Sequence, residues 1–218
     1  IAEKYLADFE EEEIFHVYNR TNNNEKLFLT DENRLFFLKR YKEIVGPFAD
    51  SYCWSLLPNH FHLLIRIKSE KLIITELQSR SKGALTMTER KFLARVARVA
   101  NLSKTYDTRV ANLSKVPPRV ANLSKVGNPD EHDSPKVGNP DEHDLPKVGN
   151  PDGHDSPKVG NPEITFSELI EQTFKRFFQS YALAFNKHHN RKGNLFYKPF
   201  KRVKIERDSQ FTMALIYI

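Results

Sequence analysis

The sequence predicts an α+β protein built on one antiparallel sheet, because segments with the two-residue period of strands are interleaved with segments of helical period. The run IFHVYN at 14–19 alternates and is rich in β-branched and aromatic residues, as strands are. Two further strand-like runs, 50–57 and 60–67, are separated by only two residues and therefore predict a hairpin.

The other elements follow from helix caps, helical spacing and breakers. They are a helix from Asp31 to Gly46, a helix over 75–93, a helix from Thr165 or Ser167 to about His189, a strand or extended arm over 195–205, and a helix from Ser209 capped by Asp208. Pro199 pushes the last strand to an edge. This order matches a ferredoxin-like antiparallel sheet with helices on one face. Nucleases and RNA-recognition modules share that layout, so the fold alone names no function.

An 11-residue repeat interrupts the domain. The unit VGNPDEHDSPK, which begins at Val126, is followed by two near-copies and a fourth start. Each full unit carries two prolines and almost no apolar residue, so it cannot bury enough surface to offset its ordering entropy. We therefore expect residues 94–162 to be a disordered insertion in a surface loop, and residues 1–93 and 163–218 to form one split domain.

The charge of the chain favours a polyanionic partner. The formal net charge is +6, but 126–162 carries −5, which leaves +11 on the rest and points most simply to nucleic acid. No apolar run approaches the roughly 18 residues that span a bilayer. There is no basic-then-apolar leader, and the single cysteine, Cys53, cannot form an internal disulfide. We expect a cytoplasmic protein with no membrane partner.

Two histidines stand one residue apart in the apolar run LLPNHFHLLIRI. In a strand, His60 and His62 project to the same face, while the intervening apolar residues face the core. Two neutral imidazoles on one face can bind one divalent ion if a third ligand comes from elsewhere. The alternative is a pair of half-exposed histidines without a ligand. The basic surroundings favour a metal that polarises a phosphate.

Four stretches resemble a known family: FHVYNRTNNNEKLF, SYCWSLLPNHFHLLIRI, YALAFNKHHNRKGNLFYKPFKR and DSQFTMALIYI. They are similar to the REP-associated tyrosine transposases, which belong to the single-strand HUH transposases, where U is a large apolar residue. His60-Phe61-His62, with Pro58-Asn59 before it, fits that motif. The resemblance covers nearly all of the chain outside the insertion, and the family's fold is ferredoxin-like.

The resemblance implies a specific chemistry. His60 and His62 would hold Mg²⁺ or Mn²⁺ against the scissile phosphate of single-stranded or hairpin DNA. One tyrosine would attack the phosphorus, become linked to the 5′ phosphate and release a 3′ hydroxyl. A phosphotyrosine conserves the energy of the phosphodiester, so no nucleotide cofactor is needed. The sequence leaves open whether the protein forms a homodimer.

Two tyrosines compete for the role of nucleophile. Tyr181 shares one helical face with four phenylalanines, which indicates a packed core residue. Tyr217 lies about 120° from Phe211 around its helix, on the flank of the apolar stripe. It also matches the tyrosine of the family. We therefore expect Tyr217 to be the nucleophile, against the alternative of an ordinary residue of an amphipathic helix.

A basic arm follows the long helix. From Lys187 to Arg207 the chain carries eight Lys or Arg, interleaved with aromatic residues that could stack on unpaired bases. Arg20, after the first strand, is similar to an arginine of the family. The alternative is a solvated edge with buried aromatics. The expected DNA-binding residues are Arg20, Arg191, Lys192, Lys198, Lys201, Arg202 and Lys204.

Two main functions follow from these patterns, and a structural metal-binding domain is a third, weaker alternative. The first is single-stranded DNA cleavage and strand transfer by a metal-dependent tyrosine transposase. The second is a non-catalytic nucleic-acid-binding module, a decayed transposase on the same fold. The insertion, and an apolar pattern that stops at Ile218, favour this second function.

Overall fold

The computed structural model of the protein describes residues 5–113 and 163–218, including all of their side chains except those of 106–113. The chain divides into two units. One consists of residues 1–100 and 163–218 and holds every expected site residue. The other consists of residues 101–162, of which only 101–113 are described.

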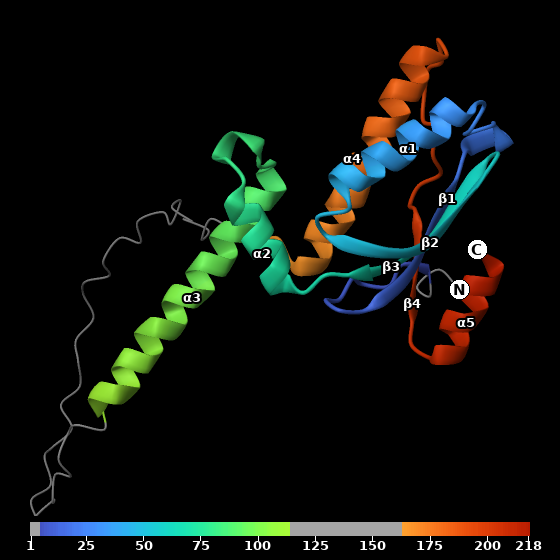
Figure 1. Cartoon of the computed structure of the whole chain (residues 1–218). Coiled ribbons are helices and arrows are strands. Elements are labelled where there is room, and N and C mark those ends of the chain that lie inside the picture. The colour runs from blue at the N-terminus through green and yellow to red at the C-terminus, as the bar shows by residue number, and fades with distance from the viewer. Residues whose placement is uncertain (1–4, 114–162) are drawn as a thin grey trace, which may run out of the picture. The chain divides into compact units, whose positions relative to one another are not determined.

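A four-stranded antiparallel sheet forms the centre of the first unit (Figure 1). Its strands are β1 (Ile14–Arg20), β2 (Ala49–Leu57), β3 (His60–Ile67) and β4 (Lys201–Ile205), in the order β2-β3-β1-β4. The first three strands were predicted to within one residue. With the α-helices described below they make an α+β fold, as expected.

The last strand is shorter than predicted. β4 begins only at Lys201, and the preceding residues meet the end of β1 through an isolated bridge between Phe196 and Thr21. Tyr197 N also donates a hydrogen bond to Arg20 O at 2.9 Å. Pro199 has no N–H to offer, so a regular ladder cannot run through it. Residues 193–200 therefore form an irregular arm, and the predicted edge position of β4 is confirmed.

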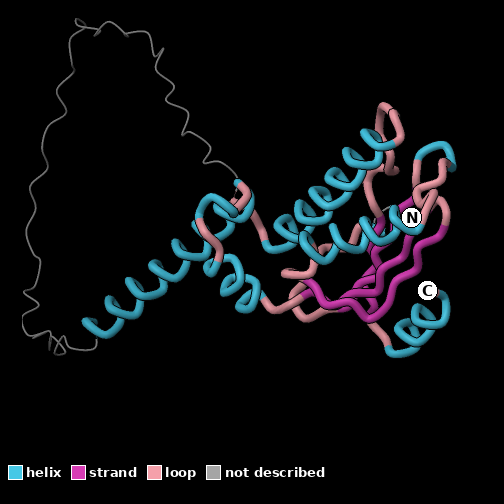
Figure 2. Tube along the Cα trace, turned by 45° about the horizontal axis from the view of Figure 1, so that its top comes forward, coloured by secondary structure: helices cyan, strands magenta, loops and turns pink. Residues whose placement is uncertain are grey.

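Two helices cover one face of the sheet (Figure 2). They are α1 (Asp31–Ile44) and α4 (Phe166–His188). The ring of Phe61 on β3 lies 5.0 Å from that of Phe37 on α1 and 5.5 Å from that of Phe178 on α4. Alternate residues of β1 and β3 are fully buried here, so the residues between them face the opposite side, which we call the open face.

Capping boxes begin both of these helices. Thr30, rather than the expected Asp31, caps α1 together with Asn33. Thr165 caps α4 together with Glu168, as one of the two predicted starts. In each box, two backbone N–H groups that lack a helical partner are bonded by side chains.

The prediction that the helices lie on one face is wrong for α5 (Asp208–Tyr217). This helix lies on the other side of the sheet from α1 and α4 (Figure 2). The ring of Phe211 meets that of Tyr52 on β2 at 5.1 Å. Leu64 of β3 points to the open face and is nevertheless fully buried, so this face also needs apolar cover. α5 reaches it directly from the edge strand β4.

The predicted helix over 75–93 is two helices, α2 (Glu70–Ser79) and α3 (Met87–Leu113). A second helix N-terminus interrupts the predicted helix. Thr86 Oγ1 accepts a hydrogen bond from Glu89 N at 3.2 Å, and Thr86 N donates one to Glu89 Oε2 at 2.6 Å. This reciprocal pair begins α3 anew after the turn at Gly83.

Residues 94–113, which were expected to be part of the disordered insertion, are helical and belong to α3. The 11-residue repeats at 126–162 lie outside the described residues. Among the helices described, none has the length and apolar character needed to cross a membrane.

Candidate functional site

His60 and His62 point together to the open face of the sheet, as predicted. In the β1–β3 register His60 faces Arg20 and His62 faces Tyr18, whereas Phe61 lies in the core. His62 is buried, with 6% of its surface exposed, and His60 is half-buried. The alternation of β3 therefore separates two polar ring systems from the core while keeping both rigid.

The turn Pro58-Asn59 fixes the first of these rings. Asn59 O accepts a hydrogen bond from Thr21 N at 2.9 Å, which ties the hairpin to the end of β1. The amide oxygen Oδ1 of Asn59 lies 2.7 Å from His60 Nδ1. An amide oxygen can only accept, so His60 Nδ1 carries the proton, and in the neutral ring Nε2 is the nitrogen with the free lone pair.

A third histidine holds the second ring. His16 Nε2, on β1, lies 2.8 Å from His62 Nδ1. The other nitrogen of His62, Nε2, is buried and has no hydrogen-bond partner among the described residues. His16 was not among the site residues predicted from the sequence. Strand alternation put it on one face, but its closeness to His62 depends on how β1 pairs with β3.

Burial favours the neutral form of His62 and of His16. Burial, and to a smaller extent the charges that His16 and His60 carry when protonated, together lower the pKa of His62 to about 4. Burial also lowers the pKa of His16. A charged form loses its hydration inside the protein, whereas a neutral ring does not. At neutral pH His62 and His16 therefore retain lone pairs for a cation or a donor.

Tyr217 lies beside the two histidines of the motif. Its ring, from α5, meets the ring of His62 edge-on with centroids 5.3 Å apart, and lies 6.4 Å from that of His16. The residue is 70% exposed. Residues 155 positions apart in the chain are thus brought together on the open face, with the tyrosine on the solvent side.

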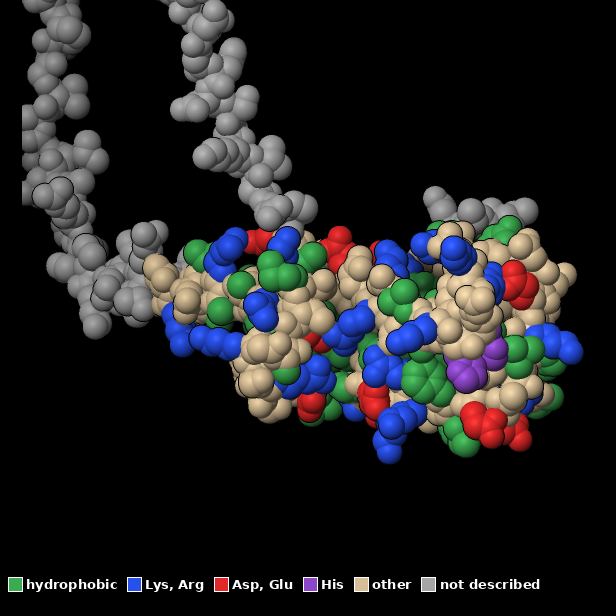
Figure 3. All heavy atoms as spheres, turned by 90° about the horizontal axis from the view of Figure 1, so that it is seen from above, with side chains coloured by type: hydrophobic (Ala, Val, Ile, Leu, Met, Phe, Trp, Pro, Cys, Tyr) green, Lys and Arg blue, Asp and Glu red, His purple; other side chains and the backbone are tan. Residues whose placement is uncertain are grey.

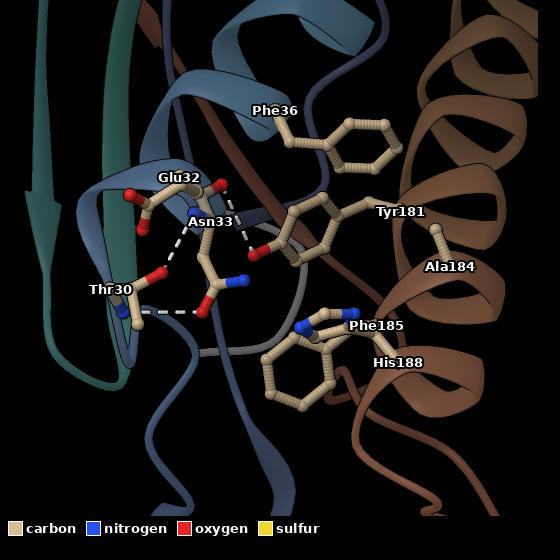
Figure 4. A pocket seen from close by; sticks show the side chains of 8 residues that line it. All are labelled: Thr30, Glu32, Asn33, Phe36, Tyr181, Ala184, Phe185 and His188. Atoms are coloured by element: carbon tan, nitrogen blue, oxygen red, sulfur yellow. Dashed lines mark hydrogen bonds between the residues drawn. The ribbon is translucent and has the colours of Figure 1, made fainter.

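Tyr181 lies in a different place, on the helix-covered face. The residue is 1% exposed, and its hydroxyl donates to Leu27 O at 3.1 Å. Figure 4 shows it between α1 and α4, in a pocket of about 480 Å³ whose rim carries Glu32 and His188. The prediction that Tyr181 is a packed core residue is confirmed.

We found no match between this chain and any protein-family model, curated protein or solved structure.

Two more tyrosines line the site. The ring of Tyr18 stacks 5.5 Å from that of His62. Lys201 Nζ lies 4.8 Å from the ring centre of Tyr5 and 5.8 Å from that of Tyr18. Burial raises the pKa of Tyr18, and the phenols of Tyr5 and Tyr217 add to this. Tyr18 was not considered as a nucleophile from the sequence, but its position makes it the main alternative to Tyr217 for that role.

The donors present suit a divalent cation that prefers imidazole nitrogen and oxygen. In a neutral His60 ring Nε2 would have a free lone pair, and His62 Nε2 is buried without a hydrogen-bond partner among the described residues, so both atoms are available as ligands. Within 5–113 and 163–218, no three His, Cys, Asp or Glu side chains are grouped so as to hold a metal ion. A third ligand would have to be of another kind, such as water or substrate oxygen.

Three of the expected DNA-binding cations are engaged within the protein. Arg202 is buried: its guanidinium donates to Ala7 O at 2.6 Å and to Glu171 at 3.0 Å. We therefore expect a structural role for Arg202 in place of the predicted DNA contact, because β4 turns this residue toward α4 and not toward solvent. Alternation places Lys204 on the same side, where it pairs with Glu10 at 2.9 Å.

Arg191 also has an internal role. It forms a two-pronged ion pair with Glu25 and donates to the carbonyls of Gly193 and Asn194. These bonds tie the beginning of the arm to the loop after β1. The charge density of the arm was visible in the sequence, but its division between structural and free cations was not.

The other four expected cations are exposed, and none of them pairs with a described carboxylate. They are Arg20, Lys192, Lys198 and Lys201. The guanidinium of Arg20 lies 4.9 Å over the ring of Tyr197, which is 49% exposed. Figure 3 shows many Lys and Arg side chains on one face of the molecule, with Asp and Glu scattered among them.

A groove of about 640 Å³ runs between α4 and the arm. Its floor includes the buried rings of Phe178, Phe196 and Phe200, and Lys175 and Lys198 are among its lining residues. The exposed ring of Tyr197 also lines the groove, and proteins bind single-stranded nucleic acids with such a combination of cations and an exposed aromatic ring.

These positions predict opposite results for two cations of the arm. Arg202→Ala should lower the free energy of unfolding by about 2 kcal/mol, because Ala7 O loses its donor and Glu171, which stays partly exposed and keeps Lys175, loses one of its two cation partners. Lys198→Ala should leave the melting temperature unchanged and weaken binding to single-stranded DNA, with a salt dependence reduced by about one counterion. Thermal unfolding and DNA titrations at several salt concentrations measure both. A stable Arg202→Ala protein with weakened DNA binding would contradict the reassignment.

Proposed function

We propose that this protein is a metal-dependent single-strand DNA transposase that cleaves and rejoins DNA through a tyrosine. The observation that carries the proposal is the meeting of Tyr217 with His62 on the open face, at 5.3 Å between ring centres. The resemblance to the REP-associated tyrosine transposases pointed to these same residues from sequence alone. The geometry is independent support, because it depends on the packing of α5 and not on the motif.

The fold supports the same proposal. The elements β1, α1, β2, β3, α4 and β4 follow one another with the strand order β2-β3-β1-β4. This order supports the proposal of a ferredoxin-like domain, to which α2, α3 and α5 would be additions. We infer that α5 is the element that turns this common scaffold toward catalysis, since it carries Tyr217 to the open face.

The proposed reaction needs few groups. The Tyr217 oxygen attacks the phosphorus, an Oη–P bond forms, and the bond from phosphorus to the 3′ oxygen breaks. The proton of the phenol is given up and the released 3′ oxygen gains one, so no cofactor is consumed. Mg²⁺ or Mn²⁺, when bound by His60 and His62, would neutralise phosphate charge. Attack by a 3′ hydroxyl on the phosphotyrosine reverses the step and joins the strands.

Exposed cations would hold the DNA beside this centre. Arg20 faces His60 across the β1–β3 ladder, and Lys201 faces Tyr18 across the β1–β4 ladder. Both therefore belong to the open face. With Tyr197 beside Arg20, they could hold phosphates and stack a base next to the proposed nucleophile.

A covalent adduct tests the proposal. Incubated with a labelled hairpin oligonucleotide and Mg²⁺, the protein should form a band that survives boiling in detergent. The band should be absent in EDTA and return with Mn²⁺. A filter-binding assay run beside it measures DNA binding without chemistry.

The outcome separates the two functions predicted from sequence. Adduct formation supports the transposase. DNA binding with no adduct in either metal would contradict it and leave the non-catalytic binding module on the same fold.

A further inference from the structure

His62 shares a hydrogen bond with a histidine of the neighbouring strand. The nitrogens His16 Nε2 and His62 Nδ1 are 2.8 Å apart, and the two rings are stacked with centroids 5.0 Å apart. At this distance one of the two nitrogens carries the proton and donates the hydrogen bond, and the other accepts that bond with its lone pair. The direction of this one bond decides which nitrogen of His62 has a free lone pair.

The neighbouring histidine shows which direction suits a cation site. His60 donates from Nδ1 to Asn59 Oδ1, so in the neutral ring its Nε2 is the nitrogen with the lone pair. His62 has its lone pair on the same nitrogen, Nε2, only if its own Nδ1 donates to His16 Nε2. The opposite direction would place an N–H on His62 Nε2, which is buried and meets no acceptor among the described residues. A buried donor without an acceptor is costly, whereas a buried lone pair can be satisfied by a bound cation.

We propose that His16 is a positioning residue that holds His62 in the tautomer protonated at Nδ1, so that His62 Nε2 presents a lone pair to a divalent cation. The inference rests on the proposed metal role of His60 and His62. His16 acts only through His62: its Nε2 is used by the hydrogen bond. It fills the place that a carboxylate or a backbone carbonyl usually takes behind a metal-binding histidine.

The tautomer can be read without DNA and without metal. In ¹⁵N NMR spectra of the metal-free protein at neutral pH, His62 should show a protonated Nδ1 and an unprotonated Nε2. In His16→Ala this pattern should be lost. The Mn²⁺ affinity, measured by calorimetry, should fall roughly 10- to 100-fold in the same variant.

Two substitutions at the same position separate positioning from packing. In His16→Gln, the amide oxygen can reach the place of Nε2 and accept from His62, so the tautomer and most of the Mn²⁺ affinity should be kept. In His16→Asn, the side chain is too short to do so, and both should be lost as in His16→Ala. His188→Ala removes an exposed histidine at the far end of α4 and should change neither reading.

Three results would overturn the inference. They are an unchanged His62 spectrum in His16→Ala, equal behaviour of His16→Gln and His16→Asn, and Mn²⁺ affinity in His16→Ala within twofold of the unchanged protein. If the unchanged protein binds no Mn²⁺, the proposed function fails, and the nitrogen spectrum alone then decides whether His16 sets the tautomer. Melting temperatures of all variants show whether a loss is one of folding.

Discussion

Tyr217→Phe should abolish the covalent adduct and reduce strand cleavage at least roughly a thousandfold, to the background rate. The substitution removes one oxygen and keeps the ring that meets His62 at 5.3 Å. Because the residue is 70% exposed, the melting temperature should not change. Gel assays with a labelled hairpin oligonucleotide measure cleavage, and mass spectrometry of a tryptic digest locates the modified residue.

Two matched variants make this result specific. Tyr181→Phe loses the buried hydrogen bond to Leu27 O, at about 1 kcal/mol of stability, but should still form the adduct. Tyr18→Phe removes the other hydroxyl near His62 and should keep the adduct on the Tyr217 peptide. Modification of the Tyr18 peptide in the unchanged protein would show that the nucleophile was assigned to the wrong tyrosine.

His60→Ala and His62→Ala should each reduce cleavage in Mg²⁺ to background while DNA binding stays within a few-fold. The proposed cation loses a ligand, whereas the exposed cations that supply most of the affinity are untouched. Calorimetry with Mn²⁺ should show the loss of metal binding directly.

Folding has to be checked for one of these variants. His62 is buried, so its truncation leaves a cavity, and His62→Gln keeps more of the volume. His60 is only half-buried, and its variant should fold normally. His188→Ala serves as the control for loss of an unrelated histidine. Cleavage at the unchanged rate by His60→Ala and His62→Gln would remove the metal role from the proposal.

Local patterns were sufficient for much of this fold. Strand alternation placed His60 and His62 opposite Phe61, because successive side chains of any strand point to opposite faces. The stripe of phenylalanines around Tyr181 predicted its burial for a similar reason. Errors arose where a second local signal competed, as at the capping box of Thr86 and Glu89, which divides one predicted helix into α2 and α3.

In the charged arm, local patterns could not predict which cations are buried and which are exposed. Arg202 and Lys201 are adjacent in a run of cations, yet one is buried against Glu171 and the other is exposed on the open face. By composition alone the two residues are equivalent cations. Which of them faces α4 depends on the pairing of β4 with β1, a contact between segments more than 180 residues apart.

The periodicity of the chain therefore decided which residues share a face of each strand or helix, since that depends only on backbone geometry. The tertiary structure decided which of those faces meet. It placed His16 behind His62 through the β1–β3 register, and it brought Tyr217 to the histidines by packing α5 on the open face. Such contacts are chosen by the burial of the whole sheet, and no window of neighbouring residues contains that information.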